Sequence, residues 1–199
     1  MSWMQTYTGI PFELTNISKD LIHFEDIVVS LSRQVRFNGH TKKPITIAQH
    51  SVLVAEMVMD AGGSDELILA ALLHDGHEAY MSDIPSPIKW ALGDNWKPFK
   101  EVEAKIDAAI SERFGIDVSL FSDPLLKHAD GSALWHEKEA LLEDWGHMWQ
   151  WDLILGDNIP LPDPNNMDLT DPWDSTQAKR EFSSFLTEYE NMKISGSTT

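Results

Sequence analysis

The chain has 199 residues, 42% of them hydrophobic and 24% charged, a composition typical of an ordinary globular protein and not of a disordered one. Its 15 Lys and Arg stand against 32 Asp and Glu, and the net charge of −17 argues against binding to a nucleic-acid polymer, whose phosphates would be repelled. The absence of cysteine excludes disulfides and thiolate metal sites, so any metal site must be built from His, Asp and Glu.

The ends of the chain and its longest apolar runs bear on domain number and location. Residues 1–5 lack the basic start and the apolar centre of a signal peptide, and no run reaches the roughly 18 apolar residues of a membrane span. We therefore expect a cytoplasmic protein that does not contact membranes. Residues 1–194 are expected to form a single domain, and residues 195–199 a disordered tail.

The first third of the chain predicts a hairpin and two helices. Residues 6–14, which contain a Gly-Ile-Pro break, suggest a small hairpin or an extended lid. Apolar residues at helical spacing predict an amphipathic helix over about residues 24–35, which stops near the turn signal Asn38-Gly39. A second helix is expected from Ile47 to about Met59, with His50 near its start. A lone histidine on such a helix is either a core residue or a ligand, and only converging ligands favour the latter.

A basic cluster lies between these two predicted helices. Arg36, His40, Lys42 and Lys43 form the densest group of basic residues in an otherwise acidic chain. The cluster is either a solvated loop or a site for an anionic group, and its position just before His50 favours the second interpretation.

An adjacent His-Asp pair follows the most apolar stretch of the chain. Residues 68–73 contain no polar side chain, which predicts a buried helix, and His74 and Asp75 come directly after it. A buried carboxylate is costly unless it is compensated, and we expect a divalent cation to compensate this one. Glu78 follows His74 by four residues and would lie on the same side of a helix or tight turn.

A proline-rich segment follows the His-Asp pair. Prolines at positions 85 and 87 are expected to exclude regular helix and to hold Asp83 and Lys89 in a rigid loop after the site. The alternative is a simple connector between helices.

Two further helices are predicted in the middle of the chain. The first has one apolar stripe from Phe99 to Phe114, ends at Gly115, and is expected to be core without chemistry. The second, from Leu126 to Leu141, places Asp130 and Glu137 on its apolar face. An aspartate there is not explained by solvation, which favours a metal ligand. Glu137 either supports the ligands or reaches the surface.

The last third of the chain is less informative. Trp145, Trp149 and Trp151 crowd one region and could stack a base, plug the bundle or form a subunit contact. Residues 156–174 predict a loop. A final helix is expected from about Ser175, capped by Asp174 or Ser175, with its apolar stripe at Ala178, Phe182, Phe185, Leu186, Tyr189 and Met192.

The order His50, then His74-Asp75, then Asp130, all on predicted helices, resembles the HD superfamily of metal-dependent phosphohydrolases. Two flanking phrases, Gln49-His50-Ser51 and the segment Asp83 to Lys89, look like the bacterial 5′-deoxynucleotidase branch and its phage relatives. Some of those phage proteins are deoxynucleoside triphosphate triphosphohydrolases, including ones that act on dATP. The resemblance extends from about Trp3 to Leu142.

The resemblance implies a fold and a set of roles. The fold would be an all-α bundle of six to nine helices with a metal site in its middle, and the protein would be a homo-oligomer in the cytoplasm, or in the host cytoplasm if a phage encodes it. The resemblance assigns metal binding to His50, His74, Asp75 and Asp130. The ion would be Mn, Co, Mg, Zn or Fe, and whether a second ion binds is left open.

The resemblance also assigns catalysis to Glu78 and Asp83, either of which could accept a proton while the other donates one. Arg36 would hold the substrate phosphate beside Phe37, which stands where a tryptophan is expected to exclude the ribose 2′-hydroxyl. Lys89 and Lys127 would neutralise phosphate charge. His40 and His77 could orient phosphate, bind a second metal ion or do neither.

Three functions follow from this pattern. The first is hydrolysis of a deoxyribonucleoside 5′-monophosphate by a metal-activated water. The second is a triphosphohydrolase that releases tripolyphosphate, for example from dATP. The third, from another class, is a non-catalytic nucleotide sensor, which the presence of all six candidate ligands and acids disfavours.

Overall fold

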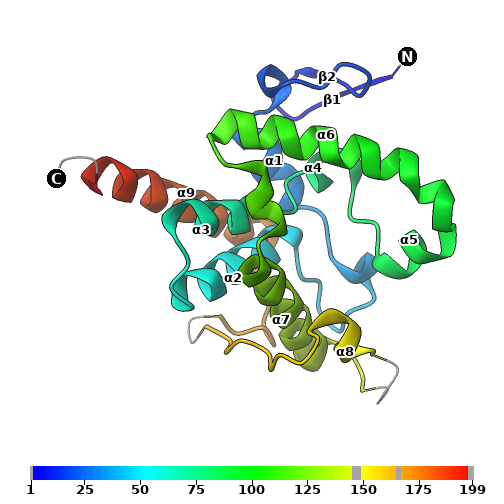
Figure 1. Cartoon of the computed structure of the whole chain (residues 1–199), viewed down its shortest axis with the longest axis vertical. Helices are drawn as coiled ribbons and strands as arrows, with labels where there is room; N and C mark the ends of the chain where they lie inside the picture. Colours follow the sequence, from blue (N-terminus) through cyan, green and yellow to red (C-terminus); the bar gives the residue numbers. More distant parts are fainter. Residues whose placement is uncertain (1, 145–148, 165–166, 197–199) are drawn as a thin grey trace.

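The computed structural model describes residues 2–144, 149–164 and 167–196, with side chains up to Tyr189. It is an all-α protein with one small hairpin, as the sequence predicts (Figure 1). The helices are α1 (Phe24–Leu31), α2 (Ile47–Asp60), α3 (Asp65–Leu73), α4 (Glu78–Met81), α5 (Ser86–Leu92), α6 (Lys97–Phe114), α7 (Pro124–Leu141), α8 (Trp151–Ile154) and α9 (Ser175–Gly196). The 3-10 turns are η1 (Lys19–Leu21), η2 (Phe37–Gly39), η3 (Gly93–Trp96) and η4 (Val118–Ser122).

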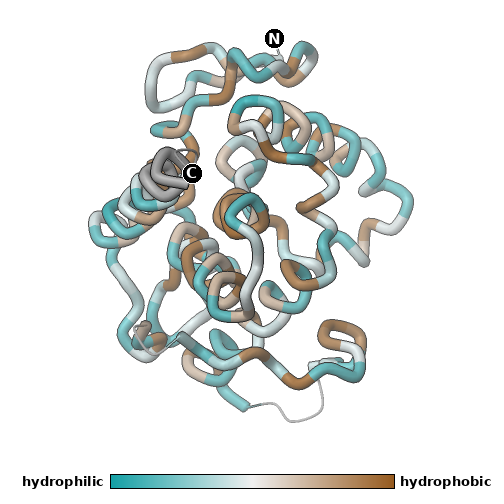
Figure 2. Tube along the Cα trace, turned by 60° about the vertical axis from the view of Figure 1, so that its left-hand side comes forward, coloured by the Kyte–Doolittle hydropathy of each residue, from teal (hydrophilic) through white to brown (hydrophobic). Residues whose placement is uncertain are grey.

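Helix α2 is the centre of the bundle. It packs against α3, α7, α9 and α1, and eleven of its fourteen residues are buried. The helix begins after Thr46, whose side chain accepts a hydrogen bond from the Gln49 amide, a normal N-cap. Because α2 is surrounded, His50, the fourth residue of this helix, lies in the interior. Figure 2 shows hydrophobic and hydrophilic residues alternating along the helices, as amphipathic packing requires.

The predicted hairpin is present and is anchored to the bundle. Strand β1 (Trp3–Gln5) pairs antiparallel with β2 (Pro11–Glu13), and Met4 lies opposite Phe12. Phe12 is fully buried and stacks on Tyr80 of α4 with ring centroids 4.1 Å apart. The hairpin therefore helps to fix the short helix that begins at Glu78.

Helix α1 is shorter than the sequence pattern predicts. It ends at Leu31 instead of continuing to about Val35, and Val35 pairs with Thr46 in an isolated bridge. The Gln34 carbonyl accepts a hydrogen bond from Ile47, and the Arg36 amide donates one to Ile45. These tertiary hydrogen bonds replace the last helical turn and turn the chain so that Arg36 faces the interior.

Two details of the segment after α4 also differ from expectation. Residues 86–92 are helical, because Pro87 lies in the first turn of α5, where its missing amide proton costs nothing. Phe99, which the apolar stripe of α6 predicts to be buried, is 46% exposed. Ile106, Ala109 and Ile110 of that stripe are in the core, and Val102 and Phe114 are partly buried against it. Gly115 ends the helix with a φ of +67°.

The C-terminal helix begins at Ser175 as predicted, but it continues to Gly196, so residues 195 and 196, which the sequence assigns to a disordered tail, are helical. The long segment before α9 lies along α7, where the side chains of His128 and His136 donate to the Ile159 and Leu161 carbonyls. Asp174 caps α9 by accepting from the amides of Thr176 and Gln177. Trp145, the side chain of Met192 and the final tail residues 197–199 lie outside what is described. Within the described part of the chain, no helix has the length and hydrophobicity needed to cross a membrane.

Candidate metal centre

Two histidines from different helices meet in the interior. His50 of α2 is fully buried, and His74, directly after α3, is 6% exposed. Their rings lie with centroids 5.3 Å apart. Neither Nε2 atom has a hydrogen-bond partner of acceptable geometry among the described residues, although both atoms are buried. Buried polar atoms without partners are rare, so this pair calls for an explanation.

Two aspartates converge on the same point. The Nε2 atom of His50 lies 3.2 Å from Oδ1 of Asp130 and 3.6 Å from Oδ2 of Asp75. The Nε2 atom of His74 lies 3.3 Å from Asp75 and 3.8 Å from Asp130. The four residues that the sequence groups as ligands therefore come together from α2, the end of α3 and α7.

The cluster fits a divalent cation. Ligand atoms bound to one ion at about 2.1 Å lie roughly 3–3.6 Å apart, close to the separations here. His50, His74 and Asp130 could hold a metal ion, since one ligand atom from each lies within 4.8 Å of the others. An ion at this point would give both unpartnered Nε2 atoms a bond. It would also offset the charge of the partly buried carboxylates of Asp75 and Asp130, which is otherwise costly.

The neighbours of each histidine hold its ring in a ligating orientation. Nδ1 of His74 donates to the Ala71 carbonyl at 2.7 Å, and Nδ1 of His50 donates to Oε1 of Glu137 at 2.8 Å. A carbonyl and a carboxylate can only accept, so each Nδ1 carries a proton, and Nε2 is the atom left to bind a metal ion when the ring is neutral. Metal-binding histidines are commonly oriented in this way.

Glu137 does not reach the surface, one of the two possibilities that the sequence leaves open. It is fully buried, and its second oxygen accepts from Nε of Arg36 at 2.9 Å. Although burial opposes it, the Arg36 guanidinium and the His50 ring hold the pKa of Glu137 below its ordinary value. Glu137 therefore connects the buried guanidinium to the candidate ligand His50.

The same ion pairs shift the pKa of the ligands themselves. Burial and Arg36 lower the pKa of His50, but the carboxylates of Glu137 and Asp130 outweigh them and raise it to about 9. Burial raises the pKa of Asp130, but the close His50 ring, with Nε2 3.2 Å away, and the His74 ring lower it to about 2. In the absence of a cation, protonated His50 and ionised Asp130 therefore stabilise each other by charge.

Glu78 and Asp83 lie beside the cluster. The backbone of α4 is held by Gln34, which donates to the Glu78 carbonyl at 3.0 Å, and by Ser30, which donates to the Ala79 carbonyl. Burial and the nearby Asp75 and Asp83 carboxylates raise the pKa of Glu78 well above its ordinary value. Burial also raises the pKa of Asp83. Carboxyl groups with raised pKa values are suited to proton transfer near neutral pH.

Strained backbone flanks these residues. Within the described ranges, the non-glycine residues with positive φ are Phe37 (+54°), Asn38 (+51°) and Ser82 (+69°). Left-handed backbone is unfavourable for a bulky residue, and such strain concentrates at functional sites. Phe37 follows Arg36 and lies under its guanidinium at 5.6 Å, and Ser82 precedes Asp83. The strained backbone therefore lies in two segments that the sequence predicts to be functional, the one that contains Arg36 and Phe37 and the one that precedes Asp83.

The other residues predicted to bind substrate, Lys89, His40 and Lys127, do not all lie close to the candidate metal centre. Lys89 lies near the carboxyls of Glu78 and Asp83, and its Nζ is 4.0 Å from Glu103. His40 and Lys127 are exposed, and neither forms an ion pair within the described residues. Lys127 lies one turn before Asp130 on α7.

Helix α6 carries polar contacts that the sequence pattern misses. Nδ1 of His77 lies 3.0 Å from Oδ1 of Asp107, and its Nε2 lies 4.0 Å from Glu103. Burial lowers the pKa of His77, but Asp107 outweighs it, and the pKa is raised. The expectation that α6 has no chemistry is therefore incomplete. The spacing of four residues between Glu103 and Asp107, beside the apolar stripe, is the signal that could have shown it.

No protein-family model matches the chain. The uncharacterized protein YfdR of Escherichia coli strain K12 is 40% identical over 149 residues, which cover 75% of this chain and 78% of that protein. The uncharacterized protein RCAP_rcc00048 of Rhodobacter capsulatus is 33% identical over 123 residues, which cover 60% of this chain and 61% of that protein. The chain therefore belongs to the YfdR family.

Proposed function

We propose that this protein is a divalent-metal-dependent phosphohydrolase of small nucleotides, with a deoxyribonucleoside 5′-monophosphate as its substrate. One observation carries the proposal: four His and Asp side chains from three helical segments converge on one largely buried point, next to two carboxyls with raised pKa values and one largely buried arginine. This is the set of groups that phosphate ester hydrolysis requires. The resemblance of the His and Asp pattern to the HD superfamily also supports a metal-dependent phosphohydrolase.

The residues Arg36, Phe37 and Lys89 would bind the substrate. Arg36 is held by Glu137 at 2.9 Å, and its Nη1 is 3.7 Å from Asp75, so a phosphate ligated at the centre would lie within its reach. A guanidinium fixed in this way recognises phosphate oxygens without losing much side-chain entropy. Phe37, packed against it, would contact the sugar. Lys89 would add charge beside the leaving group.

Glu78 and Asp83 would move the protons. A cation bound at the centre would lower the pKa of a water molecule and polarise the phosphoryl group. We assign proton donation to the leaving oxygen to Glu78, because it is the more deeply buried of the two carboxyls and retains its proton to higher pH. Asp83 would then accept the proton of the attacking water. His40 and Lys127 are exposed and would contact the substrate only at the outer edge of the site.

Two lysines of the basic cluster form ion pairs within the chain, which favours a nucleoside monophosphate over a triphosphate as the substrate. Lys42 pairs with Glu143 at 3.0 Å, and Lys43 pairs with Asp171 at 2.7 Å. These cations are therefore partly neutralised, whereas a triphosphate would call for additional positive charge near the metal.

The test is turnover of a panel of ribo- and deoxynucleoside mono-, di- and triphosphates with Mn²⁺, Co²⁺ or Mg²⁺, in which phosphate and tripolyphosphate are separated. We expect phosphate from deoxynucleoside monophosphates, and no turnover with Asp75→Ala at wild-type metal concentrations. Full activity of that variant would contradict the assignment of the centre. Tripolyphosphate from a deoxynucleoside triphosphate would replace the proposed substrate with the alternative, and silence across the panel in a metal-loaded, nucleotide-binding protein would favour a sensor.

A further inference from the structure

The position of the Glu78 carboxyl depends on the backbone that carries it. Glu78 is 6% exposed, and its Oε2 atom is buried without a hydrogen-bond partner among the described residues. Helix α4, which begins at this residue, is only four residues long, and so short a helix is marginal without packing partners. The elements that hold α4 and the turn before it therefore determine where the carboxyl lies.

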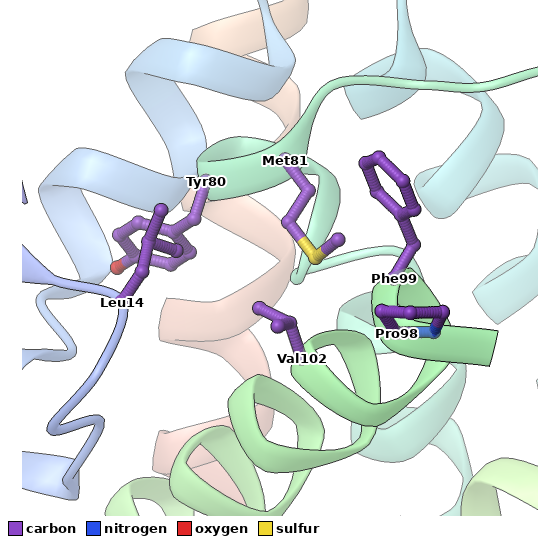
Figure 3. A pocket seen from close by; sticks show the side chains of 6 residues that line it. All are labelled: Leu14, Tyr80, Met81, Pro98, Phe99 and Val102. Carbon is purple, nitrogen blue, oxygen red and sulfur yellow. The ribbon is translucent and has the colours of Figure 1, made fainter. Parts of the chain in front are cut away.

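Apolar packing between α4 and α6 is incomplete. Helix α4 packs mainly against α1. An apolar cavity of about 380 Å³ lies between the hairpin, α4 and α6, and is lined by Leu14, Tyr80, Met81, Pro98, Phe99 and Val102. Figure 3 shows Met81 of α4 facing Phe99 and Val102 of α6 across this cavity. The side chains that line the cavity therefore do not hold α4 firmly against α6.

Helix α6 contacts the turn before α4 at two points. Nδ1 of His77 donates a hydrogen bond to Oδ1 of Asp107 at 3.0 Å, since a carboxylate can only accept. Gly76 lies so close to Ile110 that a Cβ atom there would be 2.9 Å from Cδ1 of Ile110. Asp107 and Ile110 are three residues apart and share one face of α6. Because His77 directly precedes Glu78 and is 9% exposed, the hydrogen bond fixes the residue next to the acid.

The alternative use of these side chains is to bind a second metal ion. Nε2 of His77 lies 4.0 Å from Oε2 of Glu103, whereas Asp107 lies at Nδ1. The two ring nitrogens are distinct, and a single ion is bound through one of them, so the two carboxylates do not converge on one ion with His77. The separation of 4.0 Å is also too long for a hydrogen bond. The geometry therefore favours the contact between His77 and Asp107.

We propose that Asp107, acting through His77, is a positioning residue for the proton donor Glu78. This inference rests on the proposed function, in which Glu78 protonates the leaving oxygen. Buried polar groups that are hydrogen-bonded to each other fix one arrangement of the elements that they connect. Without this hydrogen bond the turn could shift, and a misplacement of about 1 Å can lower a rate roughly 100-fold.

The test compares two substrates at saturating Mn²⁺: a deoxynucleoside 5′-monophosphate, and its analogue with sulfur in place of the bridging 5′-oxygen. A thiolate leaves without being protonated, whereas an alkoxide needs the proton of Glu78. We expect Asp107→Ala to lower kcat for the oxygen substrate by about 10- to 100-fold, and to leave kcat for the sulfur substrate and both KM values within about threefold. A merely structural role of Asp107 would lower both kcat values equally.

Three further variants accompany Asp107→Ala. Asp107→Asn retains an oxygen that accepts from Nδ1 of His77, and it should restore most of the lost kcat. Glu101→Gln, at an exposed position of the same helix, controls for the loss of one negative charge. The double variant His77→Phe/Asp107→Ala leaves no unpaired buried group, so it should fold even where Asp107→Ala does not, and it should show the same selective loss.

The outcomes separate this inference from the proposed function. Equal losses with the two substrates, an unchanged kcat, or a loss confined to KM would each overturn the inference. A weaker affinity of Asp107→Ala for Mn²⁺, measured by titration calorimetry, would also overturn it, because the contact would then act on the metal centre and not on Glu78. Turnover of neither substrate by the wild type would contradict the proposed function, and the inference would fall with it.

Discussion

Glu137 shows how one buried residue can organise a site at the scale of single side chains. Each of its oxygens accepts one charged hydrogen bond, from Nδ1 of His50 at 2.8 Å and from Nε of Arg36 at 2.9 Å. An unpaired charge in this position would be strongly destabilising, so the three groups must be considered together. Glu137 sets the position of a candidate metal ligand and of the arginine that we propose binds the substrate phosphate.

We expect Glu137→Gln to weaken metal binding by about 10- to 100-fold, the usual effect of losing a group that orients a ligand. The amide group of glutamine would present a donor to either Arg36 or His50, both of which are donors themselves. Titration calorimetry with Mn²⁺ measures the effect. Glu139→Gln is the control, because Glu139 lies on the same helix with 48% of its side chain exposed, and it should bind normally. Equal affinities in the two variants would contradict the role of Glu137.

Glu56 of α2 provides a pH dependence away from the site. Burial, together with Asp60, Asp163 and Glu181, raises the pKa of its carboxyl to about 7 from an ordinary 4.5. Because the folded state binds this proton more tightly than the unfolded chain does, its contribution to the free energy of unfolding is lost as pH rises from 4.5 to 7.

Glu56→Gln should therefore stabilise the protein at pH 8 and change little at pH 4.5. One pKa unit corresponds to about 1.4 kcal/mol, and partial exposure reduces the total, so we expect a gain of about 1–2 kcal/mol at pH 8. Urea denaturation at both pH values measures it. The exposed Glu101 of α6, changed to Gln, controls for the general effect of removing one negative charge from an acidic chain. A gain that is the same at both pH values would contradict the prediction.

At the scale of elements, the turn between α3 and α4 determines where Glu78 lies relative to His74 and Asp75. Gly76 in this turn is closely surrounded: a Cβ atom there would lie 2.9 Å from Cδ1 of Ile110 and 2.9 Å from the Leu73 carbonyl oxygen. The first contact is a flexible side chain and can yield, but the second is backbone and cannot. The turn therefore has no room for a side chain.

Gly76→Ala should destabilise the protein by about 1–3 kcal/mol, as overpacking commonly does, and should lower activity by moving Glu78. Thermal unfolding and turnover measure the two effects. The double variant with Ile110→Val removes the Cδ1 contact and should restore part of the stability, which a double-mutant cycle separates from the backbone contact. A neutral Gly76→Ala variant would show that the turn relaxes freely.

At the scale of the whole molecule, the site connects parts of the bundle that are distant in sequence. Its groups come from α2, the end of α3 and α7, and Arg36 and Asp83 come from the connecting segments. A cation bound by these groups holds the folded state only, since the unfolded chain does not bring them together. Metal binding should therefore stabilise the entire fold.

At a free ion concentration of 100 times Kd, a cation should add about 2.7 kcal/mol to the free energy of unfolding. For a protein of this size that corresponds to a rise in Tm of roughly 5–11 °C. Calorimetry with Mn²⁺ and with chelator measures it at constant ionic strength. Asp130→Asn should abolish the gain, whereas Asp157→Asn, in the exposed segment after α8, should retain it. Equal gains in both variants would mean that the ion only screens the net charge.

The sequence determined the elements whose signals are local. Apolar spacing placed α2, α3, α6 and α7 to within a few residues, because helical periodicity and capping depend on neighbours along the chain. The order of the histidines and aspartates identified the four candidate ligands, since each follows or lies on a recognisable helix. The hairpin was less visible: its turn residues also allowed an extended lid, and strand β1 (Trp3–Gln5) lies before the segment that suggested it.

Only the tertiary structure decided the features that depend on which faces meet. It ended α1 early, exposed Phe99, buried Glu137 between two partners and turned Asp107 toward His77. Periodicity assigns a residue to a face of its own helix, but it does not say which residues of another element lie opposite. The residues that lie opposite decide whether a carboxylate on an inner face is a metal ligand or an ion-pair partner. Only the packing of the helices determines which residues those are.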